Sequence, residues 1–326
     1  MRKDLQSRAS GDAQEDREAP RARKQQVEEV WLGDSLERIR DIEAESVHLI
    51  LSDIPYGISY EEWDVLHHNT NHGLLGASPS QRKSGSIFKT RGKPLNGWSQ
   101  ADKQIPLEYY EWCRSWAPDW YRVLKPGASC FVFAGRRLAH RCICALEDTG
   151  FIFKDMLAWE KETAAYRAQR VSCVFERRGD EESSLRWQGW KVGNLRPLFE
   201  PVLWFMKPYP VGGTLADNIL QNGVGAFHEE ELKRLTGQSQ GARSCSNLLR
   251  AGARNTDRGS HPAQKPVSLL EILISLVTVE DQLVLDPFCG SGSTLVAAKR
   301  LGRQYIGIEQ SEDYYGIALE RLEHAE

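Results

Sequence analysis

Long apolar runs are missing from this chain. No stretch approaches the ~18 consecutive apolar residues of a membrane span, and the N-terminus carries no secretory apolar segment. Cysteine is sparse as well: the seven cysteines are odd in number and irregularly spaced, which argues against a disulfide-bonded secreted protein. These absences predict a cytoplasmic protein without a membrane partner.

Metal-binding patterns and a strong net charge are absent too. Cys142 and Cys144 have no second pair at zinc-site spacing, so no metal site is expected. A net charge of -3 neither requires nor excludes nucleic acid, because local patches matter more than the sum. What is present, 40% hydrophobic and 27% charged residues over 326 positions, is typical of a globular chain with one large α/β domain and a smaller one.

The organisation of the chain follows from its apolar patterning. Residues 1–26 hold almost no large apolar side chains and are predicted to be a disordered polar tail. A β/α alternation runs over residues 27–161, interrupted at 66–98 by a predicted mobile loop rich in Gly, Ser, Asn and His. The alternation fades over 162–258, which indicates a separate smaller module, and returns over 259–326.

The most specific stretch is "DQLVLDPFCGSGSTLVAAKRLGRQYIGIEQ", residues 281–310. It predicts a buried strand, a glycine-rich turn, a helix and a second strand that ends at Glu309. Glycines let the backbone approach a ligand at the helix N-terminus. Glu309 follows Gly290 by 19 residues, close to the spacing at which an acid binds ribose hydroxyls. The stretch is therefore predicted to bind a nucleoside.

The details of this turn favour S-adenosylmethionine (SAM) among nucleosides. A dinucleotide fingerprint would need Gly or Ala where Leu295 stands, and a P-loop would need a lysine that the Gly-Ser-Thr at 292–294 lacks. SAM has no pyrophosphate. Asp286, at the end of the first strand, suits the cationic amino acid part of SAM.

The order of the elements predicts a circular permutation. Only 17 residues follow Glu309, too few for the other strands of a doubly wound sheet, so those strands must come from residues 30–161. The expected fold is thus an α/β, Rossmann-like sheet whose nucleoside-binding half is written last. It places "SDIPY", residues 52–56, at the sheet edge where open α/β sheets bind ligands.

That position gives "SDIPY" a chemical interpretation. The Asp53 carboxylate and the Ile54 carbonyl can accept hydrogen bonds from an exocyclic amino group, Pro55 stiffens the turn, and Tyr56 can stack on the ring that carries the amine. A flipped base beside a methyl donor would then undergo methyl transfer. Taken alone, such a short stretch is as typical of a plain turn.

Five motifs in one order resemble the amino (N6-adenine/N4-cytosine) DNA methyltransferases of the β arrangement, in which the catalytic motif precedes the SAM motif. The resemblance covers roughly residues 30–161 and 259–322. Ile54 departs from the family pattern, which has proline there. The motifs are "GDSLE" at 33–37, "SDIPY", the strands "RVLKPGASCFVF" and "MLAWEK", "HPAQKP" at 261–266, and "DPFCGSGST".

The resemblance implies roles for eleven residues. It implies catalysis by Asp53, Ile54, Pro55 and Tyr56. It implies SAM contacts from Phe288, Gly290 and Gly292, with Asp286 nearby, Glu309 on the ribose, Asp34 near the adenine and Lys265 near the methionine carboxylate. Without the family context Asp34 would be interpreted as a helix cap, a role compatible with the other, and Lys265 as an exposed cation.

The implied function is base-flipping transfer of a methyl group from SAM to the N6 of adenine in double-stranded DNA, because Asp at the first motif position is more typical of adenine enzymes than of cytosine-N4 enzymes. Cytosine N4 stays an alternative, since Ser52 precedes Asp53. An RNA or protein amide methyltransferase and a nucleic-acid-binding relic are further alternatives.

The same resemblance makes residues 162–258 the target-recognition region. It leaves open a homodimer and a cognate restriction nuclease as partners. The predicted DNA contacts come from the loop after the catalytic motif and from the recognition region: Arg82, Lys83, Lys89, Arg91, Arg167, Arg170 and Arg254.

Overall fold

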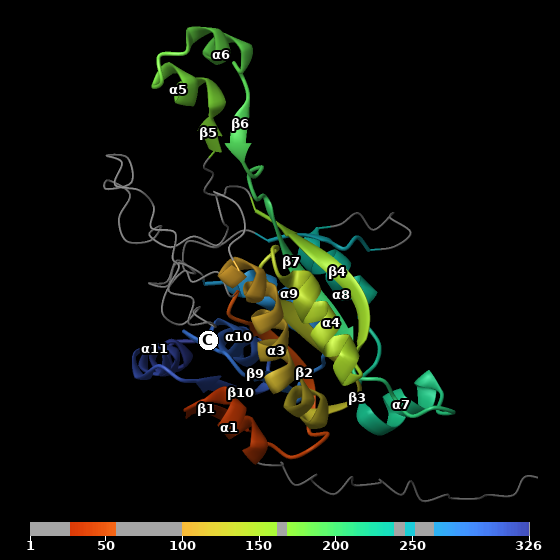
Figure 1. Ribbon diagram of the computed structural model, residues 1–326. Helices are drawn as coiled ribbons and strands as arrows, with labels where there is room; N and C mark the ends of the chain where they lie inside the picture. The colour runs from red at the N-terminus through yellow and green to blue at the C-terminus, as the bar shows by residue number, and fades with distance from the viewer. Residues whose placement is uncertain (1–26, 57–99, 162–167, 238–244, 252–263, 326) are drawn as a thin grey trace, which may run out of the picture.

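An eight-stranded sheet forms the centre of the molecule in the computed structural model, which describes residues 27–56, 100–161, 168–237, 245–251 and 264–325 (Figure 1). Its order is β1-β10-β9-β2-β3-β7-β4-β8, and β7 alone runs antiparallel to its neighbours. The strands are β1 Glu28–Leu32, β2 Val47–Asp53, β3 Leu124–Phe133, β4 Ile152–Glu160, β7 Phe199–Met206, β8 Leu248–Arg250, β9 Leu283–Asp286 and β10 Gln304–Glu309.

The permutation predicted from the sequence is confirmed by this order. Strands β9 and β10, from the end of the chain, lie between β1 and β2 from its beginning. The first five strands of the sheet order are all parallel, so their carboxyl ends meet at one edge. The fold is an α/β, Rossmann-like sheet.

Helices cover both faces of the sheet, and alternate residues of each strand face opposite layers. On β2, Ile50 faces the layer that contains α3 and α4, which lie side by side in Figure 1, while Leu49 and Leu51 face the layer of α8, α9 and α10. The helices are α1 Ser35–Arg38, the 3-10 turn η1 Ile39–Asp41, α3 Gln100–Val123, α4 Ala139–Thr149, α7 Leu215–Asn222, α8 Glu229–Thr236, α9 Val267–Val277, α10 Ser293–Arg300 and α11 Glu312–Glu323.

The interval 162–258 is not one separate module, and this prediction needs correction. Its strand β7, "FEPVLWFM", is inserted into the central sheet between β3 and β4, and β8 forms the edge beyond β4. β7 is buried on both faces, as is typical of a strand inside a sheet that helices cover on both sides, and the mixed local pattern did not reveal this.

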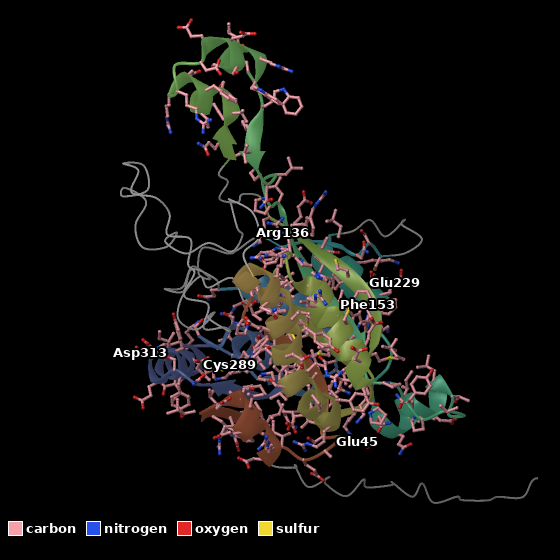
Figure 2. All side chains as sticks on the ribbon, in the orientation of Figure 1. Glu45, Arg136, Phe153, Glu229, Cys289 and Asp313 are labelled. Carbon is pink, nitrogen blue, oxygen red and sulfur yellow. The ribbon has the colours of Figure 1, made fainter. Side chains whose placement is uncertain are left out.

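The part that stands apart is a projecting arm, residues 168–193 (Figure 1). Its short strands β5 Ala168–Arg170 and β6 Lys191–Gly193 pair antiparallel, and helices α5 Val171–Glu176 and α6 Glu181–Arg186 connect them. Figure 2 shows its side chains directed outward on several sides. The predicted tail at 1–26 and loop at 66–98 lie outside the described residues. Within the described part of the chain, no helix is long and apolar enough to span a membrane.

Candidate active site

A cavity of about 880 Å³ opens at the carboxyl ends of β1, β2, β9 and β10. The last residues of three of these strands, Asp53, Asp286 and Glu309, all line it. Five further residues predicted from the sequence also line it: Asp34, Pro55, Lys265, Phe288 and Gly290. The structure therefore brings the predicted SAM-binding residues, apart from Gly292, and the predicted catalytic residues Asp53 and Pro55 around one space.

The glycine-rich turn connects β9 to α10 with two left-handed residues. Gly290 has φ +51° and lines the cavity, where no atom lies within 4 Å of an added Cβ. Gly292 has φ +77° but is not among the lining residues of the described chain; an added Cβ there would lie 2.9 Å from the Ala318 Cβ of α11. Gly292 thus has a packing role, since its missing side chain allows α10 to approach α11, and its predicted contact with SAM stays a prediction.

Asp286 and Glu309 line the part of the cavity that is predicted to bind SAM, which we call the cofactor end. Asp286 accepts hydrogen bonds from the Ser52 hydroxyl at 2.7 Å and the Phe288 backbone N–H at 3.2 Å. Burial raises the pKa of Asp286 to about 6, against the opposing effect of its hydroxyl partners. Glu309 accepts from the backbone N–H groups of Gly290 and Ser311, each at 2.8 Å, and burial raises its pKa as well.

A stripe of tryptophans on α3 positions the aromatic ring of the turn. Trp112, Trp116 and Trp120 recur every four residues, and the Phe288 ring contacts all three at centroid distances of 5.9, 6.5 and 6.2 Å. Trp112 and Phe288 both line the cavity. The adjacent Cys289 (labelled in Figure 2) is buried, which raises the pKa of its thiol and keeps it from acting as a nucleophile.

Asp34 caps a helix and lines the cavity, which leaves both roles considered for it compatible. Its Oδ1 accepts a hydrogen bond from the Leu36 backbone N–H at 2.9 Å, which caps α1, and its side chain lines the cavity. The backbone N–H of Gly33 donates to the Glu309 carbonyl at 2.9 Å, which joins the ends of β1 and β10. The first motif and the last are thus brought together by the sheet.

Asp53 also lines the cavity, and both of its carboxylate oxygens are engaged; we call its surroundings the catalytic end. Oδ1 accepts from the Tyr56 hydroxyl at 3.0 Å, and Oδ2 lies 2.5 Å from the Lys265 ammonium. Burial raises the pKa of Asp53 and Glu200 adds to this, while Lys265 opposes it. From α3, the Tyr109 hydroxyl donates to the Pro55 carbonyl at 3.2 Å and holds the turn.

Lys265 occupies a position that the sequence did not predict. Its ammonium lies between Asp53 and Glu200, 3.2 Å from the latter, and the residue is 6% exposed. The alternative of an exposed cation is wrong, because Lys265 is buried between two acids, while its predicted contact with the methionine carboxylate of SAM stays a prediction. The two carboxylates outweigh burial and raise the pKa of Lys265.

Glu200 and Lys161 are site residues that sequence reasoning missed. Glu200, on β7, is 8% exposed, accepts a hydrogen bond from the Tyr56 hydroxyl and pairs with Lys161 as well as Lys265. Burial alone would raise its pKa, but the two lysines prevail and hold the pKa of Glu200 at about 2. A lone acid within an apolar strand was the available signal.

The cavity's residues fit SAM. Asp286 offers a buried acid to the amino group, Glu309 an acid at the second strand's end, and Phe288 an apolar surface. The Nε2 atom of Gln264, which also lines the cavity, is buried without a hydrogen-bond partner in the described part of the chain. It supplies a donor for a carboxylate. No cluster of three metal-ligating side chains occurs among the described residues.

One of the predicted DNA contacts is described by the structure. Arg170 is exposed at the end of β5, at the base of the arm. The other six lie outside the described residues: Arg82, Lys83, Lys89, Arg91, Arg167 and Arg254.

Comparison with known proteins defines the class to which this fold and site belong. A family model for N6 and N4 methyltransferases, described as DNA methylase, matches residues 47–320. The Type II methyltransferase M.HindIII of Haemophilus influenzae is 56% identical over 293 residues, covering 90% of this chain and 94% of that protein. M2.DpnII of Streptococcus pneumoniae is 26% identical over 292 residues, covering 89% and 87%.

Solved structures share the fold. The cytosine-N4-specific PvuII DNA methyltransferase superposes with a TM-score of 0.57 at 19% identity, covering 90% of this chain and 86% of that one. The M1.HpyAVI–SAM complex has a TM-score of 0.51 at 20% identity, covering 91% and 98%. Fold and cavity define a SAM-dependent α/β methyltransferase. The chain belongs to the DNA methylase family of amino methyltransferases, as its motifs predicted.

Proposed function

We propose that this enzyme transfers the SAM methyl group to the N6 amino group of adenine within a specific sequence of double-stranded DNA. The observation that carries the proposal is the link between the two ends of the cavity. Ser52 and Asp53 are neighbours at the end of β2; Ser52 donates to the cofactor-end acid Asp286, while Asp53 points to the catalytic end. The amine and the methyl donor would meet between them.

The chemistry follows from the groups around Asp53. The Asp53 carboxylate and the Ile54 carbonyl accept hydrogen bonds from the amino group and orient its lone pair. SAM, when bound, supplies the electrophilic methyl carbon. A bond forms from the nitrogen to this carbon as the carbon–sulfur bond breaks, and Asp53 takes the proton that the nitrogen loses. Positioning and preorganised charge would supply most of the acceleration.

The position of Ser52 supports adenine over cytosine. Its adjacency to Asp53 was the feature that kept cytosine N4 open, since cytosine-N4 enzymes commonly have Ser at the first motif position. In the structure Ser52 is fully buried, and its hydroxyl donates to Asp286 rather than facing an amine. Asp53 is then the group at this position that would meet the base.

We also infer that the arm contributes to DNA binding. Asp53, Phe133, Val202 and Leu157 form one row across four strands, so β4 leaves the sheet at the catalytic edge and continues into the arm. Phosphate contacts would come from exposed cations on the arm and just beyond it: Arg170, Arg177, Arg178, Arg186, Lys191 and Arg196. Arg82, Lys83, Lys89, Arg91, Arg167 and Arg254 stay predicted contacts, as a homodimer and a cognate nuclease stay predicted partners.

The decisive experiment incubates the protein with tritiated SAM and unmethylated genomic DNA, digests the DNA to nucleosides and separates them by mass. We expect labelled N6-methyladenine that the Asp53→Ala variant does not form. N4-methylcytosine would overturn the base assignment, and label confined to RNA or protein would overturn the DNA substrate.

A further inference from the structure

Glu200 is a buried charge that the chemistry described above does not use. It is the second residue of β7 and pairs across the sheet with Trp159 of β4. Two lysines from different segments, Lys161 and Lys265, form ion pairs with it. A buried ion pair seldom adds stability over an apolar alternative of the same volume, so its presence beside a catalytic acid points to another role.

Two side chains connect Glu200 to Asp53. The Tyr56 hydroxyl donates to both carboxylates, at 3.0 Å for Asp53 Oδ1, and the Lys265 ammonium lies against both, at 2.5 Å from Asp53 Oδ2 and 3.2 Å from Glu200 Oε1. Lys161, which contacts the Glu200 carboxylate, anchors it from the far side. Neither Glu200 nor Lys161 is among the cavity's lining residues in the described chain.

We propose that Glu200 is a positioning residue for methyl transfer: it holds Lys265 and Tyr56 from the side opposite Asp53, and so sets the aim and the proton affinity of the Asp53 carboxylate. The proposal rests on amino methylation by this site, and it is independent of which base is methylated. Glu200 acts through its two shared partners.

The charges around Asp53 indicate whether Glu200 strengthens or weakens Asp53 as a base. Tyr56, Lys265, Glu200 and Asp286 are the titratable groups that act on Asp53 or are acted on by it. With Glu200 ionised, Lys265 is shared between two acids, and the second negative charge favours the protonated form of Asp53. Asp53 is therefore a stronger base than it would be if Lys265 were its partner alone, which suits a group that takes a proton from the methylated amine.

Removal of the Glu200 charge should weaken that base. In Glu200→Gln the amide keeps the shape of the side chain and an acceptor for the Tyr56 hydroxyl. Asp53 is then the one carboxylate of the two that still forms an ion pair with Lys265. The pKa of Asp53 then falls, because one charge that raises it is lost and its cationic partner is no longer shared. We expect kcat to fall about 10- to 100-fold and the acid limb of its pH profile to move about one unit lower, with KM for DNA and Kd for SAM within about twofold.

The experiment compares total methyl transfer into unmethylated genomic DNA, from tritiated SAM, as a function of pH. Glu160→Gln is the matched control: Glu160 is on the neighbouring strand, pairs with the exposed Arg250 at 2.6 Å and does not contact Asp53 in the structure. Glu200→Asp keeps the charge, so its acid limb should stay at the wild-type position. Lys161→Met removes a cation that offsets the Glu200 charge, so the second acid acts more strongly on Asp53 and the limb should shift in the opposite direction to that of Glu200→Gln, by less.

Each outcome bears on the proposal. A lower limb in Glu200→Gln with an unmoved limb in Glu160→Gln and Glu200→Asp supports it. An unchanged rate, or a lower rate with an unmoved limb, overturns it in favour of a merely structural charge. If circular dichroism shows that Glu200→Gln does not fold, the limb of Lys161→Met decides: a higher limb supports the proposal, and an unmoved limb overturns it. Wild-type protein that labels no DNA would instead overturn the proposed function itself.

Discussion

The two ends of the cavity are built in different ways. The cofactor end comes chiefly from one continuous stretch, the β9–α10–β10 unit, and its acids Asp286 and Glu309 are held largely by backbone N–H groups and hydroxyls. The catalytic end draws Asp53, Lys161, Glu200 and Lys265 from four separate segments, and charged side chains hold it together. One continuous β-α-β unit is enough to form a nucleoside site. The proposed catalytic end needs segments that the assembled sheet brings together.

The largest expected effect comes from removing Lys265, the cation that Asp53 and Glu200 share. Lys265→Met leaves two buried acids without their shared cation, which should cost about 3–5 kcal/mol of stability, as loss of one partner of a buried pair does. Methyl transfer should be lost as well. Thermal unfolding and a methylation assay measure both effects.

Acid should partly restore the stability of Lys265→Met, because protonation neutralises the unpaired carboxylates. Wild-type Glu200 behaves oppositely: its pKa is lowered from 4.5 to about 2, so its contribution is present above 4.5 and is lost as the pH falls toward 2. Arg250→Met, which breaks the exposed pair with Glu160, is the control and should change stability by less than about 1 kcal/mol. Equal losses in both variants would contradict the account.

A second prediction concerns the cofactor end. The pKa of Asp286 is raised to about 6, chiefly by burial, so the acid is protonated below that pH and cannot pair with the cationic amino group of SAM. Affinity for SAM should weaken about tenfold between about pH 7 and about pH 5. Asp286→Asn should bind SAM weakly and lose most of this dependence. Isothermal titration calorimetry at several pH values measures it, and a wild-type pH dependence in the variant would show that another group is responsible.

The smallest expected effects are those of substituting alanine for the two glycines of the turn, Gly290 and Gly292, and they should differ in kind. Gly292→Ala places a methyl group 2.9 Å from Ala318 Cβ at a positive φ, and should cost about 1–3 kcal/mol of stability. Gly290→Ala has space around the new methyl but lines the cavity, so it should weaken SAM binding more than stability. Unfolding and SAM titration of both variants test this. Weaker SAM binding by Gly292→Ala with normal stability would support the predicted contact of Gly292 with SAM.

The difference between the two ends also explains which parts of the site could be predicted from the sequence. The cofactor end was predicted because its strand, turn, helix and acid follow one another within a single stretch, and because only a permuted sheet could complete it. Asp53 and its turn were recognised from "SDIPY" once that sheet was inferred. The packing role of Gly292 was not predicted, because spacing along the chain does not show that α11 passes close to the turn.

The catalytic end held what the sequence could not show. Glu200 lies in an interval predicted to be a separate module, and only the pairing of β7 with β3 and β4 brings it to Asp53. The ion pairs of Lys265 with Asp53 and Glu200 could not be predicted for the same reason. Contacts between distant segments depend on the strand order, which local patterns do not encode.

The most direct test of this division is to measure SAM binding and methyl transfer in Asp53→Ala beside Asp286→Asn. We predict that Asp53→Ala binds SAM within about twofold of wild type and loses about a thousandfold or more in kcat, whereas Asp286→Asn loses SAM affinity and regains methyl transfer at high SAM concentration. Methylation that survives in Asp53→Ala, or SAM binding lost equally in both variants, would contradict it.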